Sequence, residues 1–289
     1  MKGMVRMTAG IPEIRIDALL PQEMATRAEQ VGVRKAQMPA LTMFVLAILA
    51  GAFIALGALF ATTVAAGTSG AMPYGVARLL VGLVFSVGLI LVIVGGAELF
   101  TGNNLIVMAW ASGEVGTLSL LRNWLIVYIG NFVGSIGTAV LMFFAKQYTF
   151  GSGAVGVAAL STANSKVQLG FVQAIALGIL CNTLVCLAVW MSFSARSTID
   201  RIAAIVFPIS TFVAAGFEHS IANMYFIPIG LLIKEFDPAF AAGTGMDLSS
   251  LTWLNFLWGN LVPVTIGNII GGGFLVAAVY WFVFLRHRD

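Results

Sequence analysis

Six long apolar runs constrain this chain more than any other feature of its sequence. Each is long enough to cross the hydrocarbon core of a bilayer, which takes about 20 helical residues. The runs lack the polar and apolar alternation of barrel strands. Apolar residues make up 60 % of the chain and charged residues only 9 %. We therefore predict an all-α membrane protein with six transmembrane helices, near residues 41–66, 79–111, 118–144, 167–193, 202–233 and 254–285.

The second and fifth runs are too long for simple spans, and polar residues interrupt both at matching positions. One pattern occurs in each: Gly96, Glu98 and Asn103 in GAELFTGNN, and Gly216, Glu218 and Asn223 in GFEHSIANM. Unwound backbone facing lipid would leave amides and carbonyls unpaired, at several kcal/mol each. We therefore predict that both helices are broken and that the breaks line a polar path inside the protein. Matching interruptions of this kind are typical of a transport site at the bilayer midplane.

The halves of the chain resemble each other beyond these interruptions. Span one contains FVLAILAG at 44–51 and span four contains FVQAIALG at 171–178. Spans three and six share four residues at identical spacing: Asn123, Gly130, Asn131 and Gly134, and Asn260, Gly267, Asn268 and Gly271. An odd number of spans per unit makes the second copy enter the membrane from the opposite side. The sequence thus predicts two inverted three-helix repeats, about 41–146 and 167–285.

The charged ends indicate orientation. Residues 1–40 are charged throughout and lack the apolar core of a signal peptide. Within them, 12–35 alternates apolar and charged residues, which favours an interfacial amphipathic helix, although a plain cytosolic tail fits the pattern as well. Basic residues gather in 1–40, near the connections after spans two and four, and in the tail 286–289. By the positive-inside rule we expect both termini in the cytoplasm and a channel domain at 41–285.

Other function classes find little support in the sequence. The net charge of +3 is a signal of topology, and we see no basic patch suited to nucleic acid. The chain has no HExxH or GxSxG motif and no GxxxxGK loop, so we expect neither an enzyme nor an ATP-driven pump. We predict no cofactor and no metal site, and Cys181 and Cys186 are expected to pack inside span four. A water or glycerol channel would share the expected architecture, but Lys166 and His219 suit an anion or a weak acid better. A proton-coupled carrier remains as an alternative.

The segments GAELFTGNN, GFEHSIANM and LVPVTIGNIIGG resemble the signature segments of the formate/nitrite transporter family. The resemblance covers nearly the whole chain. It implies an aquaporin-like protomer, a homopentamer with one pore in each protomer, and a place in the bacterial cytoplasmic (inner) membrane. It also implies small monovalent anions or their conjugate acids as substrates, including formate, nitrite and hydrosulfide. VCLAVWMSFSARS and the C-terminal end are most similar to formate channels, whereas GAELFTGNN also resembles nitrite channels.

The resemblance implies roles for individual residues. Four polar residues fall at pore positions: His219, Thr101, Asn182 and Lys166. Five apolar residues fall at constrictions: Phe85, Leu89 and Phe212, with Leu99 and Phe100 in the flexible break. Four residues beside the breaks are expected to be structural: Glu98, Glu218, Asn103 and Asn223. Plainer interpretations stay open: a snorkelling lysine at 166, a helix-to-helix hydrogen bond at Asn182, a satisfied core histidine at 219, and simple packing of the phenylalanines.

The chemistry of these residue types supports an anion path with a proton at its centre. A small anion that leaves water for a medium of low dielectric constant faces an idealised cost on the order of 20 kcal/mol, and protonation removes most of it. His219 is the only histidine in the predicted spans, and histidine is the side chain that titrates nearest physiological pH. We expect a neutral His219 that shares a proton with an arriving anion, while Lys166 raises the local anion concentration. The expected function is therefore a passive, pH-dependent formate channel; a nitrite or other small anion channel and a proton-coupled formate symporter are the alternatives.

Overall fold

The computed structural model describes residues 18–68 and 70–286, and within these residues the chain is helical, with no strand. The first half contains α1 (Pro21–Ala36), α2 (Ala40–Ala65), α3 (Tyr74–Gly95), the 3₁₀ helix η1 (Gly102–Ile106), α4 (Val107–Ala111), α5 (Thr117–Phe144) and the 3₁₀ helix η2 (Gln147–Thr149). The second half contains α6 (Ala154–Val167), α7 (Phe171–Ser192), α8 (Thr198–Ala214), α9 (Ser220–Phe236), α10 (Pro238–Gly243), the π-helical η3 (Asn255–Leu261), α11 (Val262–Ile269), the π-helical η4 (Ile270–Ala278) and α12 (Val279–Phe284).

Among the described residues, five helices are long and apolar enough to cross a membrane: α2, α3, α5, α7 and the continuous segment Asn255–Phe284. The remaining predicted span, the fifth, at 202–233, is divided between α8 and α9, which have 17 residues each. Neither reaches the about 20 residues that a span requires. The predicted break in the fifth run is confirmed and explains the difference between five and six. The second run is broken as well, because α3 ends at Gly95 and η1 starts only at Gly102.

Glycines begin both breaks. Gly96 and Gly216 have φ of 77° and 78°, a left-handed conformation that glycine adopts without steric cost. Asn131 on α5 then binds the first break: its Oδ1 accepts from the Phe100 amide at 2.9 Å and its Nδ2 donates to the Glu98 carbonyl at 2.9 Å. Asn268 on α11 binds the Ser220 amide and the Glu218 carbonyl in the same way, at 2.9 and 3.0 Å. These two asparagines thus supply partners to the unwound backbone.

The close helix contacts fix how the two halves correspond, and one part of the expected alignment is wrong. Asn131 donates to the Ala47 carbonyl and Asn268 donates to the Gly178 carbonyl. Ala47 therefore corresponds to Gly178, whereas the sequence match paired Gly51 with Gly178. The error is one helical turn. Ala47 and Gly51 lie one turn apart, so a small residue occurs on this helix face in either register.

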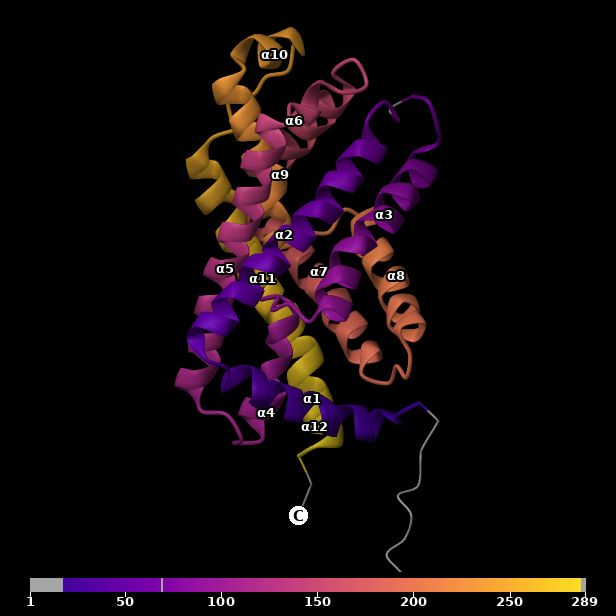
Figure 1. The fold of residues 1–289 in the computed structure, drawn as a ribbon, viewed down its shortest axis with the longest axis vertical. Helices are drawn as coiled ribbons and strands as arrows, with labels where there is room; N and C mark the ends of the chain where they lie inside the picture. Colours follow the sequence, from indigo (N-terminus) through magenta and orange to yellow (C-terminus); the bar gives the residue numbers. More distant parts are fainter. Residues whose placement is uncertain (1–17, 69, 287–289) are drawn as a thin grey trace, which may run out of the picture.

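A helix that the sequence reading missed, α6, is the counterpart of α1. Gly32 on α1 packs against Ala109 on α4, and Ala163 on α6 packs against Gly230 on α9. Figure 1 shows α1 lying across one end of the bundle beside α4 and α12, and α6 beside α9 and α10 at the other end. The contacts thus repeat over a unit of α1 to α5 and a unit that starts at α6.

The amphipathic N-terminal helix begins later than expected. Of the predicted segment, residues 12–17 lie outside the described residues, and 18–20 are not helical. Met24, Ala25 and Ala28 on α1 are buried and pack in one cluster with Leu105 and Met108. The helix is therefore packed onto the bundle, which rules out an unstructured tail over Pro21–Ala36. Of the tail 286–289, only Arg286 is described.

Candidate functional site

A partly buried ion pair lies beside the first break. Lys35, at the end of α1, contacts Glu98 with an Nζ to Oε1 distance of 2.7 Å. Asn103 Nδ2 donates to Glu98 Oε2 at 2.7 Å and contacts Asn123 Oδ1 at 3.0 Å, while Lys35 Nζ donates to Asn103 Oδ1 at 3.0 Å. Asn123 Nδ2 donates to the Lys35 carbonyl at 3.0 Å. The pair is hydrogen-bonded on both sides, which is what a buried pair needs to offset its desolvation.

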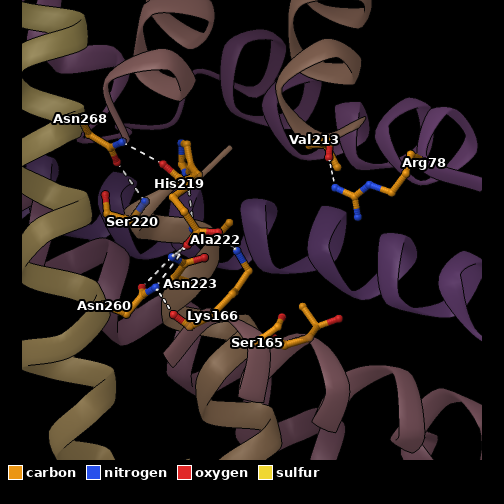
Figure 2. Close-up of polar contacts among 12 residues, drawn as sticks. Arg78, Ser165, Lys166, Val213, His219, Ser220, Ala222, Asn223, Asn260 and Asn268 are labelled. Atoms are coloured by element: carbon orange, nitrogen blue, oxygen red, sulfur yellow. Dashed lines mark hydrogen bonds and ion pairs between the residues drawn. The ribbon is translucent and has the colours of Figure 1, made fainter. Parts of the chain in front are cut away.

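The same arrangement recurs beside the second break. Lys166, at the end of α6, contacts Glu218 with an Nζ to Oε1 distance of 2.6 Å. Asn223 Nδ2 lies 2.7 Å from both Glu218 Oε2 and Asn260 Oδ1, and Asn260 Nδ2 donates to the Lys166 carbonyl at 2.9 Å. Figure 2 shows Lys166, Asn223 and Asn260 gathered beside His219. One difference from the first cluster stands out: Asn223 Oδ1 is buried and has no hydrogen-bond partner among the described residues.

Two cavities flank the breaks, one at each end of the protomer. The cavity that we call the α1 vestibule has a volume of about 290 Å³, and its walls include Lys35, Glu98, Leu89 and Leu99. The cavity that we call the α6 vestibule has a volume of about 90 Å³. The residues that line it include Arg78, Phe85, Lys166, Phe212, His219 and Asn223. Both members of the first Lys–Glu pair thus line the α1 vestibule, whereas only Lys166 of the second pair lines the α6 vestibule.

Little protein separates the vestibules. Leu89 faces the α1 vestibule, and Phe85, one turn earlier on α3, faces the α6 vestibule. One turn of α-helix rises about 5.4 Å. We call the protein between the two vestibules the barrier. His219 Nε2 lies 3.0 Å from Thr101 Oγ1, and this contact joins the two broken helices. Both side chains are buried, at 3 % and 0 % exposure.

The start of α9 determines the state of His219. His219 caps this helix, because its Nδ1 accepts a hydrogen bond from the Ala222 amide at 3.1 Å. A nitrogen that accepts cannot carry a proton, so this geometry requires the neutral imidazole with its proton on Nε2. Nε2–H then donates to Thr101 Oγ1, which leaves the Thr101 hydroxyl proton free to point elsewhere. To become an imidazolium, His219 must break its hydrogen bond to Ala222.

Aromatic rings form the wall on the α6 side of the barrier. The Phe85 and Phe212 ring centroids are 5.7 Å apart in an edge-to-face arrangement, and the Phe212 and His219 rings are stacked at 5.8 Å. Phe100 is placed differently, because it packs behind the first break against Tyr128 and Trp124, with ring centroids 4.9 and 6.0 Å away. Among the five residues assigned to constrictions, Phe100 alone lines neither vestibule.

Asn182 has the contacts of a structural residue. Its Nδ2 donates to the Thr101 carbonyl at 3.2 Å and to the Asn268 carbonyl at 2.7 Å. Both donors are thereby used to bind the first break to α11. These contacts match the helix-to-helix alternative, but Asn182 Oδ1 is buried and has no partner among the described residues, so the pore role stays a prediction. Like Thr101, Asn182 lines neither vestibule.

Arg78 on α3 is a site residue that sequence reasoning missed. Its guanidinium donates to the carbonyls of Val213 and Ala214, with Nε 3.1 Å from the Ala214 oxygen. Figure 2 shows Arg78 beside Val213, the last turn of α8. Helix C-termini carry partial negative charge on unpaired carbonyls. Arg78 therefore cancels the negative end of α8 where it reaches the α6 vestibule.

Comparison with known proteins agrees with this geometry. A family model described as formate/nitrite transporter matches residues 22–282. This chain belongs to the formate/nitrite transporter family. It is 50 % identical to the formate channel FocA of Escherichia coli K12, over 94 % of this chain and 97 % of that one. It is 40 % identical to the formate channel FocA of Haemophilus influenzae, over 93 % and 96 %. A solved structure described as a pentameric formate channel with formate bound superposes with a TM-score of 0.80 at 46 % identity, and covers 86 % of this chain and 98 % of that one.

Membership in the formate/nitrite transporter family accounts for the positions that the motifs predicted, but the motifs did not point to Lys35. A signal for it is present in the sequence. Lys35 begins KAQ at 35–37, just before α2, and Lys166 begins KVQ at 166–168, just before α7. These short polar segments lie at the edges of the apolar spans, where the repeated motifs of the spans do not extend.

Proposed function

We propose that this chain is a passive, pH-dependent channel that moves formate across the bacterial cytoplasmic membrane. Formate is the substrate named for the channels of Escherichia coli and Haemophilus influenzae, to which the chain is similar over nearly its whole length. The observation that carries the proposal is the hydrogen-bonded pair of Thr101 and His219 in a barrier about one helical turn thick between two vestibules.

In this mechanism Lys166 draws the anion into the α6 vestibule. Its charge is partly balanced by Glu218, so binding stays weak enough for release. An anion that enters the apolar barrier faces a desolvation cost of several kcal/mol even after relaxation. We propose that it takes up a proton from water in the α6 vestibule, crosses as formic acid, and returns the proton to water in the α1 vestibule. The Thr101 hydroxyl donates to its carbonyl oxygen, and the unpartnered Asn223 Oδ1 accepts its hydroxyl proton.

The position of His219 supports a proton-linked path. As a neutral donor to Thr101 it holds the hydroxyl in place, and it presents no fixed positive charge that would trap an anion. It gains a proton only by giving up its contact with Ala222. We propose that this competition links flux to pH.

We propose the remaining features on the strength of the family. The protomers assemble into a homopentamer, as in the solved pentameric formate channel. Both termini lie in the cytoplasm, so the α1 vestibule faces inward, and lipid surrounds the assembly. The chain is a transport protein and not an enzyme. Nitrite or another small anion is the alternative substrate, and proton-coupled symport is the alternative mechanism.

The proposal is tested by initial uptake rates in liposomes that contain the full-length protein. Formate, nitrite, hydrosulfide and chloride are compared at two pH values over a range of concentrations. We expect formate to enter faster than chloride, with rates that rise as the pH falls and stay linear with concentration. Saturation at low concentration favours the symporter, and faster nitrite uptake favours the alternative substrate. Formate uptake no faster than in protein-free liposomes contradicts the proposal.

A matched pair of variants tests whether the path of formate passes the Thr101 hydroxyl. Thr101→Val removes the hydroxyl at the barrier, whereas Thr138→Val removes one that donates to the Gly134 carbonyl on α5, away from both vestibules. We expect Thr101→Val to lower formate uptake at least tenfold and Thr138→Val to leave it within about twofold.

A further inference from the structure

The α1 vestibule has far more positive charge on its walls than the transport of a monovalent anion requires. Arg27 and Arg34 lie two turns apart on α1, and Arg201 lies on the first turn of α8. All three line this one cavity. Residues seven positions apart share a helix face, so the two α1 arginines point to the same side. The vestibule is therefore lined by arginines from two elements.

These charges are not balanced locally. Among the described residues, Glu98 is the one acidic residue in the cavity wall, and Lys35 already pairs with it. Arg27 donates to the Phe193 carbonyl at 3.2 Å, which fixes its position but does not neutralise it. Among residues 18–68 and 70–286, the side chains of Arg34 and Arg201 have neither an ion-pair nor a hydrogen-bond partner. Three positive charges thus remain.

Two acidic residues close to these arginines along the chain accept hydrogen bonds from backbone amides. Asp200 precedes Arg201 directly, but its carboxylate accepts from the Arg196 and Ser197 amides at the start of α8. Glu23 on α1 accepts from the Leu20 amide. Neither carboxylate lines the α1 vestibule. Glu23 does line a neighbouring cavity with Arg27 and Arg34, so it offsets part of their charge from outside the vestibule, and Arg201 lies outside that cavity.

We infer that the arginines of the α1 vestibule form a binding site for a small multivalent oxyanion of the inorganic phosphate class. The planar guanidinium fork matches the oxygens of a tetrahedral oxyanion, and charge-assisted pairs of this kind are among the stronger hydrogen bonds in proteins. The volume of about 290 Å³ is several times the roughly 30 Å³ that one water occupies in the liquid. The cavity therefore has room for a hydrated or four-oxygen anion.

Such an anion binds but does not pass. The vestibule ends at Leu89 and Leu99, which are 2 % exposed each. The cost of desolvation rises steeply with charge, so a divalent oxyanion cannot enter this apolar barrier. It would occupy the vestibule and slow the exit of the transported anion. The α6 vestibule lacks this site, because Lys166 pairs with Glu218 and Arg78 is used by two carbonyls.

Equilibrium binding of inorganic phosphate to the purified full-length protein tests the site without any flux measurement. Chloride at the same ionic strength is the competitor. We expect the double variant Arg34→Gln/Arg201→Gln to bind phosphate at least tenfold more weakly than the wild type. The control Arg196→Gln removes a positive charge five residues before Arg201 and outside the vestibule, and is expected to bind within twofold of the wild type. An unchanged elution volume on size exclusion shows that each variant is folded.

Two results would overturn the site: phosphate held no more tightly than chloride, or equal phosphate binding by the double variant and the wild type. Block of formate exit rests in addition on the proposed function. With phosphate added on the α1 side of oriented liposomes, we expect slower formate flux, and no effect from the α6 side. If the protein binds phosphate but carries no formate, the proposed function fails and the oxyanion site stands.

Discussion

At the scale of single residues, the site depends on groups whose hydrogen-bonding capacity is nearly all used. His219 accepts from the Ala222 amide and contacts Thr101, and both glutamates have a lysine on one oxygen and an asparagine on the other. Among the buried side-chain oxygens that have no partner within the described residues, Asn223 Oδ1 belongs to a residue that lines a vestibule. A polar group left without a partner inside a protein is costly, so its presence beside the barrier marks where a substrate or water is expected to bind.

The first prediction concerns His219. His219→Phe keeps an aromatic ring beside Phe212 but removes both nitrogen contacts. We expect it to abolish pH-dependent formate movement, because the Thr101 hydroxyl loses its donor, while the oligomer stays intact. Uptake at two pH values and size exclusion are the measurements. Full retention of the pH dependence in this variant refutes the assigned role.

The second prediction concerns the ion pair beside the second break. The Lys166 side chain is 14 % exposed and that of Glu218 is 5 % exposed. Lys166→Met leaves the Glu218 charge buried without its partner, and loss of one member of a buried pair costs about 3–5 kcal/mol. Thermal unfolding in detergent should therefore show a lower midpoint. The double variant Lys166→Met/Glu218→Gln should recover most of the lost stability. If its midpoint is no higher than that of Lys166→Met, the unpaired Glu218 charge is not the cause of the destabilisation.

At the scale of elements, the pattern of apolar runs was enough to predict the spans and both breaks, and it failed where the signal was weak. Run length and glycine punctuation predicted the division of the second and fifth runs. The helix α6 was missed because it is short, mixed in composition and too polar to count as a span. The register of α2 against α7 was wrong because Ala47 and Gly51 offer the same small surface one turn apart. The register and the short helix are evident only from contacts between residues that are distant in the sequence.

The third prediction concerns the crossing of α2 and α5. A Cβ at Gly134 would fall against the Ile48 carbonyl oxygen, which belongs to rigid backbone. Gly134→Val should therefore force α2 and α5 apart and lower the thermal midpoint of the protein markedly. Gly137, one turn along on α5, has no heavy atom within 4 Å of the corresponding position, and Gly137→Val is the matched control. Equal midpoints for the two variants would contradict the packing.

The fourth prediction concerns α1. Deletion of residues 1–30 removes Met24, Ala25 and Ala28 from their contacts with α4 and opens the α1 vestibule. Since this helix lies across the mouth of the vestibule, we expect its loss to change how formate flux depends on pH. The same uptake assay measures the effect. A deletion variant with the pH dependence of the full chain would argue against a gating role.

At the scale of the whole molecule, two related halves build one path with unequal ends. Each half contributes a break, an asparagine that binds it and a Lys–Glu pair. The ends differ in charge, because the α1 vestibule has three arginines beyond its ion pair. The repeat was visible in the sequence through its long motifs. This difference between the ends was not, because it arises from residues on α1 and α8 that only the folded chain brings to one cavity.

The central claim is that the substrate crosses the barrier together with a proton. The most direct test records formate uptake, internal pH and electrical current at the same time in liposomes that contain the full-length protein. If formate crosses together with a proton, the interior acidifies in step with formate uptake while little or no current flows. Current that accompanies formate uptake without acidification would mean that the bare anion crosses, and would contradict the account.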